Sequence, residues 1–188
     1  MSIEKEYQLA IDELNVIVSE SMRTRKGKKK SAEVTDDILS ILVEAYLLGL
    51  YHASKMMSQE VSVNMVKMQN VIYQNIEGKT FAERAAEHIN NGNDGRLESL
   101  VESEFHRIYN TAVEDGVRET GRRNVTKTWL TVRDNRVRET HQYLEGISVP
   151  MSEDFYTFDG DHAPFPGGFE KPENNINCRC ILRYRSEP

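Results

Sequence analysis

The stretch GRRNVTKTWLTV, residues 121–132, is where the character of the chain changes. Its residues 125–132 are rich in β-branched side chains and include the only tryptophan, Trp129, which is typical of a strand. Ahead of it, apolar residues recur every three or four positions, and behind it come short extended segments separated by turns. We therefore predict an α+β fold, with a mainly helical N-terminal region (residues 1–121) and a small C-terminal α+β module (residues 122–188) that contains a short antiparallel sheet.

Helical spacing of apolar residues predicts five helices in the N-terminal region. The fourth helix begins at Thr80, which stands three residues before Glu83, the spacing of a capping box. The first helix carries an apolar stripe formed by Tyr7, Ile11, Leu14 and Val18. The expected helices cover residues 3–22, 33–58, 61–76, 81–90 and 95–115.

Glycines and methionines in these helices have more than one interpretation. Gly49 either weakens the second helix or permits a close contact with another helix. Gly116 and Gly121 are expected to end or loosen the fifth helix. A methionine group is either core filler or an adaptable surface for a partner, and its members are Met56, Met57, Met65 and Met68.

The C-terminal module is expected to contain one short helix and a final strand. Asp134 can cap a helix over residues 135–145, and Gly146 can close it. Residues 147–150 and 154–158 are short extended segments, and residues 160–175 form a long irregular loop rich in proline and glycine. The final strand, residues 176–184, alternates with period two. Its inward face would comprise Ile176, Cys178, Cys180, Leu182 and Tyr184, and its outward face Asn177, Arg179, Ile181 and Arg183.

Composition excludes several classes of protein. With 188 residues, of which 38% are hydrophobic and 29% charged, the chain can form one ordinary domain with a modest core. It has no apolar run long enough for a membrane span, and the N-terminus lacks the pattern of a signal peptide. Two cysteines in such a chain indicate a reducing compartment. The net charge of −6 disfavours nonspecific nucleic-acid binding by the whole surface.

One basic segment, residues 23–30, departs from this acidic balance. Its polar composition is typical of a solvated linker between helices. The alternative is a contact with phosphates, such as those of DNA, or with an acidic partner. The residues that would make this contact are Arg23, Arg25, Lys26, Lys28, Lys29 and Lys30.

The two cysteines admit three interpretations. On the apolar face of the predicted strand, they can be small buried hydrophobes. A zinc site would need ligands in addition to Cys178 and Cys180. Only one residue separates these two cysteines, whereas two to four residues usually separate a pair of zinc ligands. A nucleophile would need an activating neighbour, and Arg179 is expected on the opposite face. A disulfide between the two cysteines is disfavoured by geometry. The candidates for additional zinc ligands are His141, His162 and Asp161.

His141 is the other residue with a chemical interpretation. On the predicted helix it shares a face with Val137 and Leu144, which is typical of a core histidine. Arg138, three residues earlier, would be its neighbour, and the pair could serve a nuclease-like or transferase-like site. Residues 159–162, Asp-Gly-Asp-His, are interpreted as a tight turn rather than a cation site. The sequence contains no P-loop, dinucleotide-binding, HExxH or GxSxG motif.

The order of these residues along the module forms a recognisable series. A tryptophan in a strand is followed by Asp-x-Arg-Val-Arg-x-x-His-x-x-Leu-x-Gly at 134–146, by Phe155, by a Gly/Pro-rich loop and by Ile-Asn-Cys-Arg-Cys at 176–180. Over about residues 122–184 this series resembles the Mu F-like phage head morphogenesis domain. The loop at 160–175 departs from the shorter version of that family. The signature residues are Trp129, Asp134, Arg136, Arg138, His141, Gly146, Asn177, Cys178, Arg179 and Cys180.

The resemblance implies a minor capsid or head morphogenesis protein that is not an enzyme. Such a protein would associate with the phage portal protein and with major capsid or scaffolding protein. It would lie in the virion, at the head interior or portal vertex, and in the host cytoplasm during assembly. Residues 1–121 would dock on these partners.

The same resemblance leaves alternatives to a purely structural protein. Some relatives carry a toxin domain after this module, and none is expected here. The alternative function is a phage-delivered nuclease-like or transferase-like enzyme that uses His141 and Arg138. The resemblance implies no cofactor, and a zinc ion on His141, Cys178 and Cys180 is the alternative that the residues leave open.

Overall fold

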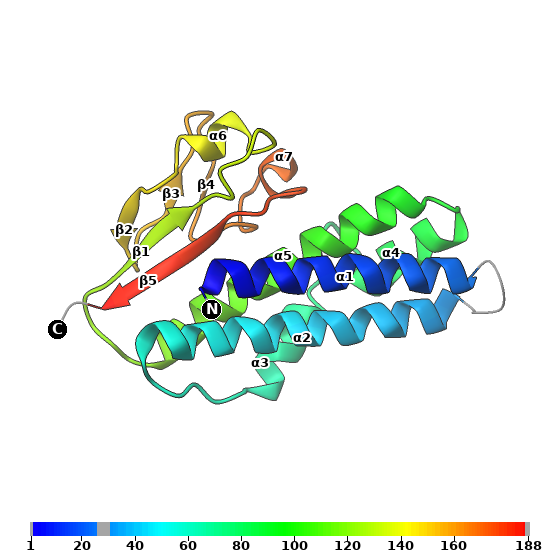
Figure 1. Cartoon of the computed structure of the whole chain (residues 1–188), viewed down its shortest axis with the longest axis horizontal. Helices are drawn as coiled ribbons and strands as arrows, with labels where there is room; N and C mark the ends of the chain where they lie inside the picture. Colours follow the sequence, from blue (N-terminus) through cyan, green and yellow to red (C-terminus); the bar gives the residue numbers. More distant parts are fainter. Residues whose placement is uncertain (1, 26–30, 187–188) are drawn as a thin grey trace.

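The computed structural model describes residues 2–25 and 31–186. Its helices are α1 (Ile3–Arg25), α2 (Ser31–Met57), α3 (Met65–Ile72), α4 (Phe81–Asn90), α5 (Asp94–Glu119), α6 (Glu139–Gln142) and α7 (Pro172–Asn175). Its strands are β1 (Val125–Leu130), β2 (Ser148–Pro150), β3 (Phe155–Tyr156), β4 (His162–Ala163) and β5 (Ile181–Ser186). Long helices come first and the strands follow, so the predicted α+β fold is confirmed (Figure 1).

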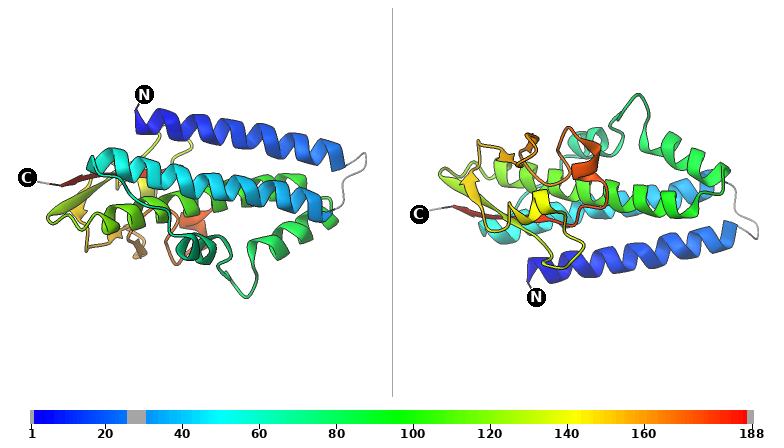
Figure 2. Two further views of the ribbon diagram at one scale, coloured as in Figure 1. Left: turned by 90° about the horizontal axis from the view of Figure 1, so that it is seen from below. Right: turned by 90° about the horizontal axis from the view of Figure 1, so that it is seen from above.

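A layer of helices is built around the pair α2 and α5. Helices α1 and α4 each pack against both members of this pair, and the long helices run along a common axis (Figure 2). The predicted stripe of α1 is buried in this layer, as is the apolar face of α2. Burial of these faces stabilises the helices more than their intrinsic propensity does.

Gly49 of α2 lies where the two central helices approach each other most closely. A Cβ atom at this position would lie 2.6 Å from the carbonyl oxygen of Tyr109 and 2.7 Å from the Cβ of Ala112, both on α5. The interpretation of Gly49 as a close helix contact is therefore confirmed. Gly116 serves the same purpose from α5, because a Cβ there would lie 2.7 Å from the Cβ of Ala53. The expectation that Gly116 ends α5 is wrong, since this helix continues to Glu119.

The predictions for the two shorter helices, α4 and α3, differ in accuracy. At α4, the Thr80 side chain accepts from the backbone N–H of Glu83, and the Glu83 carboxylate accepts from Thr80, so the predicted capping box is confirmed. Helix α3 is shorter than the predicted 61–76, because Asn64 caps it and Tyr73 ends it. The methionine group divides between the two interpretations: Met57 and Met68 are buried, Met56 is partly buried, and Met65 is exposed.

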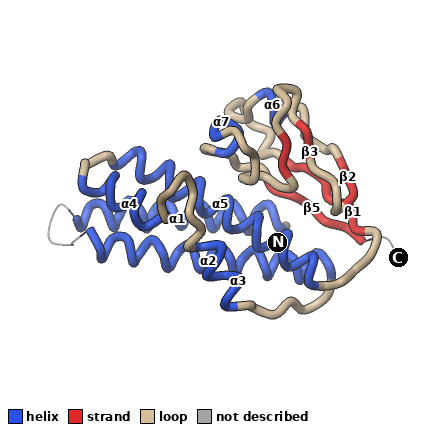
Figure 3. Tube along the Cα trace, turned by 180° about the vertical axis from the view of Figure 1, so that it is seen from behind, coloured by secondary structure: helices blue, strands red, loops and turns tan. Residues whose placement is uncertain are grey.

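The strands gather on one side of the helical layer (Figure 3). The main sheet is antiparallel with the order β2-β1-β5, so the last strand returns to lie beside the first. Trp129 on β1 is the register partner of Leu182 on β5, and Thr128 is the partner of Ser148 on β2. A second, two-stranded sheet pairs Phe155 with Ala163. The predicted short antiparallel sheet is present.

Sheet and helices share one continuous buried core. The hydroxyl of Tyr184 on β5 donates to the carboxylate of Glu114 on α5 at 2.5 Å. On the other side, Arg183 of β5 forms an ion pair with Glu4 of α1. The apolar cluster runs from the α1 stripe to Trp129 without interruption. The division of the chain into two domains at residue 121 stays a prediction. In the structure, the two parts pack against each other.

The predicted helix over 135–145 is wrong, because only Glu139–Gln142 is helical. Arg133 has a left-handed backbone with φ of 56°, and the carboxylate of Asp134 accepts from the N–H of Arg136, which forms a turn. Arg138 is extended, so the helix can begin only after it. Gly146, with φ of 77°, does provide the left-handed residue after this segment.

The predicted strand over 176–184 begins five residues late, at Ile181. Residues 172–175 form α7, and Asn177 has a left-handed φ of 56°, so the chain turns before it pairs with β1. Ile176 is 50% exposed, which contradicts its inward assignment, whereas Ile181 is buried although it was assigned outward. Cys178, Cys180, Leu182 and Tyr184 are buried as predicted.

No helix among residues 2–25 and 31–186 is both long and apolar enough to cross a membrane. The basic segment falls largely outside the described residues. Lys26, Lys28, Lys29 and Lys30 are not described, Arg25 is the last residue of α1, and Arg23 is exposed on the same helix. A contact between this segment and DNA stays a prediction.

Candidate functional site

The signature residues converge on a buried cluster between the main sheet and the segment that precedes β5. His141, from α6, is 1% exposed. Its ring packs edge-to-face on Trp129 of β1, with centroids 5.3 Å apart, and stacks on Phe169 at 5.4 Å. His141 therefore lies in the core, as the core-histidine interpretation predicts.

Both cysteines face this histidine. The Nδ1 atom of His141 lies 3.5 Å from the Sγ atoms of Cys178 and Cys180, which are free thiols. One polar atom from each of the three residues lies within 4.8 Å of the others. The second ring nitrogen, Nε2, has no hydrogen-bond partner among the described residues.

A cavity of about 10 Å³ adjoins the cluster. Its lining includes His141, both cysteines and Arg138. A volume of this size holds about one water molecule or one ion, not an organic substrate. Together with the burial of the three side chains, this small volume disfavours nucleophilic catalysis by the cysteines.

The pKa values of the two thiols are shifted in opposite directions, in part because the thiols interact with each other. Burial raises the pKa of Cys178, but hydrogen bonds from Cys180, His106 and His141 together bring it well below its usual value. The pKa of Cys180 is raised well above its usual value, chiefly by its hydrogen bond to Cys178. The two thiols therefore titrate as a coupled pair.

The charged signature residues hold the surrounding backbone. Arg179 donates two hydrogen bonds of 2.8 Å to the carboxylate of Asp134. Arg138 donates to the carbonyl oxygens of Glu173 and Ile176, so its guanidinium braces α7 and the segment after it. The expectation that Arg138 and His141 form a catalytic pair is not supported by these contacts, because each side chain has structural partners of its own.

Asn177 connects the signature to the helical layer. Its side-chain oxygen accepts from the hydroxyl of Ser99 at 2.6 Å, and its backbone N–H donates to the hydroxyl of Ser103 at 3.3 Å. Both serines lie on α5. Arg136 is more exposed and forms a longer ion pair of 3.7 Å with Asp134. The signature thus serves mainly to fold the module and to attach it to α5.

Two of the predicted zinc ligands lie elsewhere. The carboxylate of Asp161 accepts from the backbone N–H groups of His162, Glu170 and Lys171 and from the amide of Asn174. His162 is exposed and pairs with Asp154 at 2.9 Å. Asp161 organises the loop, as the tight-turn interpretation predicts, and neither residue belongs to the cysteine cluster.

His106 is the residue of the site that sequence reasoning missed. It is 1% exposed on α5, and its Nδ1 atom lies 2.7 Å from the hydroxyl of Tyr7 on α1. Its ring is close enough to Cys178 to lower the pKa of that thiol. In the sequence it stands just off the apolar stripe of its helix, which gave no sign of the distant cysteine.

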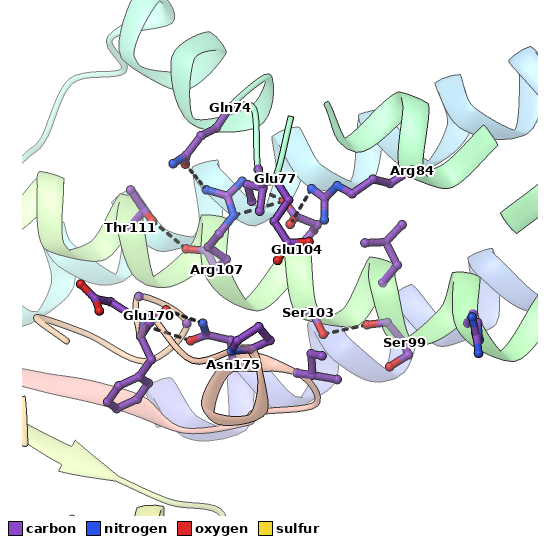
Figure 4. Close-up of a pocket in the computed structure, with 18 of the residues that line it drawn as sticks. Gln74, Glu77, Arg84, Ser99, Ser103, Glu104, Arg107, Thr111, Glu170 and Asn175 are labelled. Atoms are coloured by element: carbon purple, nitrogen blue, oxygen red, sulfur yellow. Dashed lines mark hydrogen bonds and ion pairs between the residues drawn. The ribbon is translucent and has the colours of Figure 1, made fainter. Parts of the chain in front are cut away.

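A larger cavity of about 660 Å³ separates α4 and α5 from the loop at 165–176 (Figure 4). Its most buried charges are already paired. Arg107 donates to Glu104 at 2.8 Å, to Gln74 at 2.8 Å and to the carbonyl oxygen of Val71 at 2.9 Å. Arg84 donates to the other oxygen of Glu104 at 3.0 Å. These contacts cross-link the helices around the cavity.

Comparison with known proteins gives one family. The model of the family described as phage Mu protein F like protein matches residues 50–183. This range begins within the last part of α2, ends within β5, and includes every residue of the cysteine cluster as well as His106. No solved structure matches the chain.

Two curated relatives are similar to parts of the chain. The NAD(+)–arginine ADP-ribosyltransferase EFV of Enterococcus faecalis (strain ATCC 700802 / V583) is 28% identical over 152 residues, 78% of this chain and 31% of that protein. The minor head protein GP7 of Bacillus phage SPP1 is 34% identical over 61 residues, 32% of this chain and 20% of that protein. The chain therefore spans less than a third of the length of either relative.

Proposed function

The chain belongs to the family of phage Mu protein F like proteins, and on this premise we propose that it is a minor capsid protein that binds the portal protein during head assembly. The observation that carries the proposal is the family match over residues 50–183, supported by the similarity to a phage minor head protein. The head morphogenesis role follows from the family. The portal as partner, and major capsid or scaffolding protein as further partners, are the proposed part.

The mechanism is binding through exposed surfaces, because the signature side chains serve the interior. His141, Cys178 and Cys180 are buried, and Arg138, Asp134 and Arg179 hold neighbouring segments. Buried side chains, and side chains that hold neighbouring segments, are poorly placed to contact a partner protein. The binding surface must then be sought on the helices.

Helix α3 and the residues just before it present the best candidate, which we call the α3 surface. It comprises the exposed side chains of Val63, Met65, Val66 and Tyr73. Val66 and Tyr73 are seven residues apart and so lie on one helix face. Isolated exposed apolar residues are common, but several together on a short helix favour an interaction site.

A shallow apolar groove continues the α3 surface. A cavity of about 290 Å³ lies between α2 and α3 and is lined in part by Leu39, Val43, Met68 and Tyr73. An apolar helix or loop of a partner could bury its side chains there, as in other helix-in-groove complexes. We propose that the portal protein supplies that segment.

The enzyme alternative, which would use His141 and Arg138, is supported by the transferase name of one relative. That name belongs to a protein of which this chain covers 31%. In the present chain, the small cavity beside His141 and the structural contacts of Arg138 offer no room for a dinucleotide. We therefore propose that the chain acts without catalysis.

The virion, at the head interior or portal vertex, is the proposed location, with the host cytoplasm as the site of assembly. The basic segment that includes Arg23 and Lys28 could contact packaged DNA there, since its charge is opposite to that of the chain as a whole.

Co-purification with the portal protein of the same phage tests the proposal. The full chain carries an affinity tag, and the variant Val66→Asp/Tyr73→Ser alters the α3 surface. The matched control is Leu9→Asp/Val16→Ser, which changes two exposed apolar residues of α1. The expected result is retention of the portal by the wild type and the control, and its loss by the α3 variant.

Either of two results would overturn part of the proposal. A wild-type chain that retains no portal rules out that partner. An α3 variant that binds the portal as well as the wild type does, while circular dichroism shows both folded, rules out the α3 surface.

A further inference from the structure

The cysteine cluster has the spacing of a metal centre. A tetrahedral zinc ion with Zn–S bonds of about 2.3 Å and Zn–N bonds of about 2.0–2.1 Å places its nitrogen and sulfur ligands roughly 3.5–3.6 Å apart. The two distances between the His141 Nδ1 atom and the sulfur atoms are both 3.5 Å. One nitrogen equidistant from two sulfur atoms is what a shared ion would require.

Hydrogen bonding alone satisfies this cluster poorly. A thiol is a weak donor and a weak acceptor, and the three polar groups lie in an apolar environment made by Trp129 and Phe169. The adjoining cavity of about 10 Å³ is the size of a single ion or water.

The backbone explains how a spacing of one residue still brings both sulfur atoms to one point. Asn177 turns the chain with a left-handed φ before the first cysteine. Between the cysteines, Arg179 points away and is held by Asp134 through two hydrogen bonds. Cys178 and Cys180 can therefore face the same side, toward His141.

Among the described residues, the ligand atoms that converge belong to His141, Cys178 and Cys180. Both ring nitrogens of His106 have other neighbours: Nδ1 lies 2.7 Å from the hydroxyl of Tyr7, and Nε2 lies 3.3 Å from the amide nitrogen of Asn110. The chain therefore supplies three ligands, and a water molecule would take the fourth position of a tetrahedral zinc ion.

We propose that His141, Cys178 and Cys180 bind one zinc ion, which fastens α6 to the segment before β5. Nitrogen and sulfur donors are the ligands that zinc prefers, and two thiolates balance the charge of the ion. Both cysteines must bind as thiolates, so zinc binding releases the protons that they carry. The inference does not depend on the proposed function, since it concerns how the chain folds.

The test is the metal content of the full chain, purified without chelators and without a histidine tag. Elemental analysis should find about one zinc ion per chain. Cobalt replacement should give the strong absorption of thiolate-bound tetrahedral cobalt. Cys178→Ser should lose the metal, whereas the control His162→Ala, which changes an exposed histidine outside the cluster, should keep it. His141→Ala should weaken zinc binding by at least about tenfold in competition with a chromophoric chelator.

The wild-type measurement decides even if a variant fails to fold. A wild-type chain that holds no stoichiometric zinc after incubation with the ion overturns the proposal. Zinc retained in full by folded Cys178→Ser places the ion elsewhere and also overturns it. Unchanged affinity in His141→Ala removes His141 from the ligand set and, with it, the proposed link to α6.

Discussion

Asp134 and Arg179 join the two halves of the family signature through a pair of hydrogen bonds, each 2.8 Å long. Asp134 lies just after the strand that carries Trp129, and Arg179 lies between the two cysteines. The planar guanidinium matches the carboxylate in a way that a lysine could not. This pair explains why an acidic residue and an arginine forty-five positions apart can belong to one structural unit.

Asp134→Asn should lower stability at neutral pH, and the loss should shrink in acid. Arg179 is the main reason that the pKa of Asp134 is lowered, from 3.8 to about 2. A lowered carboxyl pKa stabilises the fold above the unfolded value and loses that effect as the pH falls from about 3.8 toward 2. Urea unfolding at pH 7 and at pH 2.5 measures the difference between wild type and variant.

The control for this prediction is a double-mutant cycle with Arg179→Met. If the pair acts as a unit, the double variant should lose less stability than the sum of the two single variants. An equal difference between wild type and Asp134→Asn at both pH values would show that the charge of Asp134 is not the cause.

Gly49→Ala should destabilise the protein by about 1–3 kcal/mol, although alanine favours a helix. The new Cβ would meet the backbone oxygen of Tyr109 at 2.6 Å, and a helix backbone cannot yield locally. Thermal or urea unfolding measures the change. The matched control is Gly95→Ala in the first turn of α5, where no atom lies within 4 Å, and it should be neutral or stabilising. A stable Gly49→Ala would mean that α2 and α5 are less closely packed than described.

Thr80→Ala should cost about 1 kcal/mol, because it removes the cap of α4. The Thr80 hydroxyl accepts from the N–H of Glu83 at 3.3 Å, and the Glu83 carboxylate accepts from the N–H of Thr80 at 2.7 Å. Thr80→Ser keeps the hydroxyl and is the control. Equal unfolding midpoints for the alanine and serine variants would exclude a contribution from the cap.

His52 should make stability fall as the pH drops below about 6.5. Burial lowers the pKa of His52 below its usual 6.5, and this effect exceeds that of its hydrogen bond to Glu6. A base with a lowered pKa contributes stability that is fully present above the unfolded value and is lost as the pH falls. His52→Gln should therefore flatten the dependence of the unfolding midpoint between pH 8 and pH 5. A variant with the same slope as the wild type would assign that dependence to other groups.

Several elements could be predicted from the sequence because their signals are local. The α1 stripe, the capping box of α4 and the strand around Trp129 each follow from spacing within a few residues. The segment at 135–145 could not, because the side chain of Asp134 binds a distant arginine and a local turn instead of capping a helix. The start of β5 could not be predicted either, because the left-handed turn at Asn177 is accompanied by hydrogen bonds to Ser99 and Ser103, which lie far away in the sequence.

The residues of the site also separate into those that a local sequence pattern predicts and those that distant contacts determine. The pattern of the last strand correctly indicated that Cys178 and Cys180 are buried, and His141 was a candidate from the start. The approach of His106 could not be foreseen, because it results from the packing of α5 against the module. In the sequence, His106 stands just off the apolar stripe of its helix, and this position does not indicate which distant residues it approaches.

The most direct test of the central claim is the protein composition of purified procapsids. Procapsids would be assembled from the major capsid, scaffolding and portal proteins of the same phage together with this chain, and quantified by mass spectrometry. The account predicts that the chain is present in procapsids that contain the portal and is lost from procapsids assembled without it. A chain that is absent from portal-containing procapsids would contradict the account.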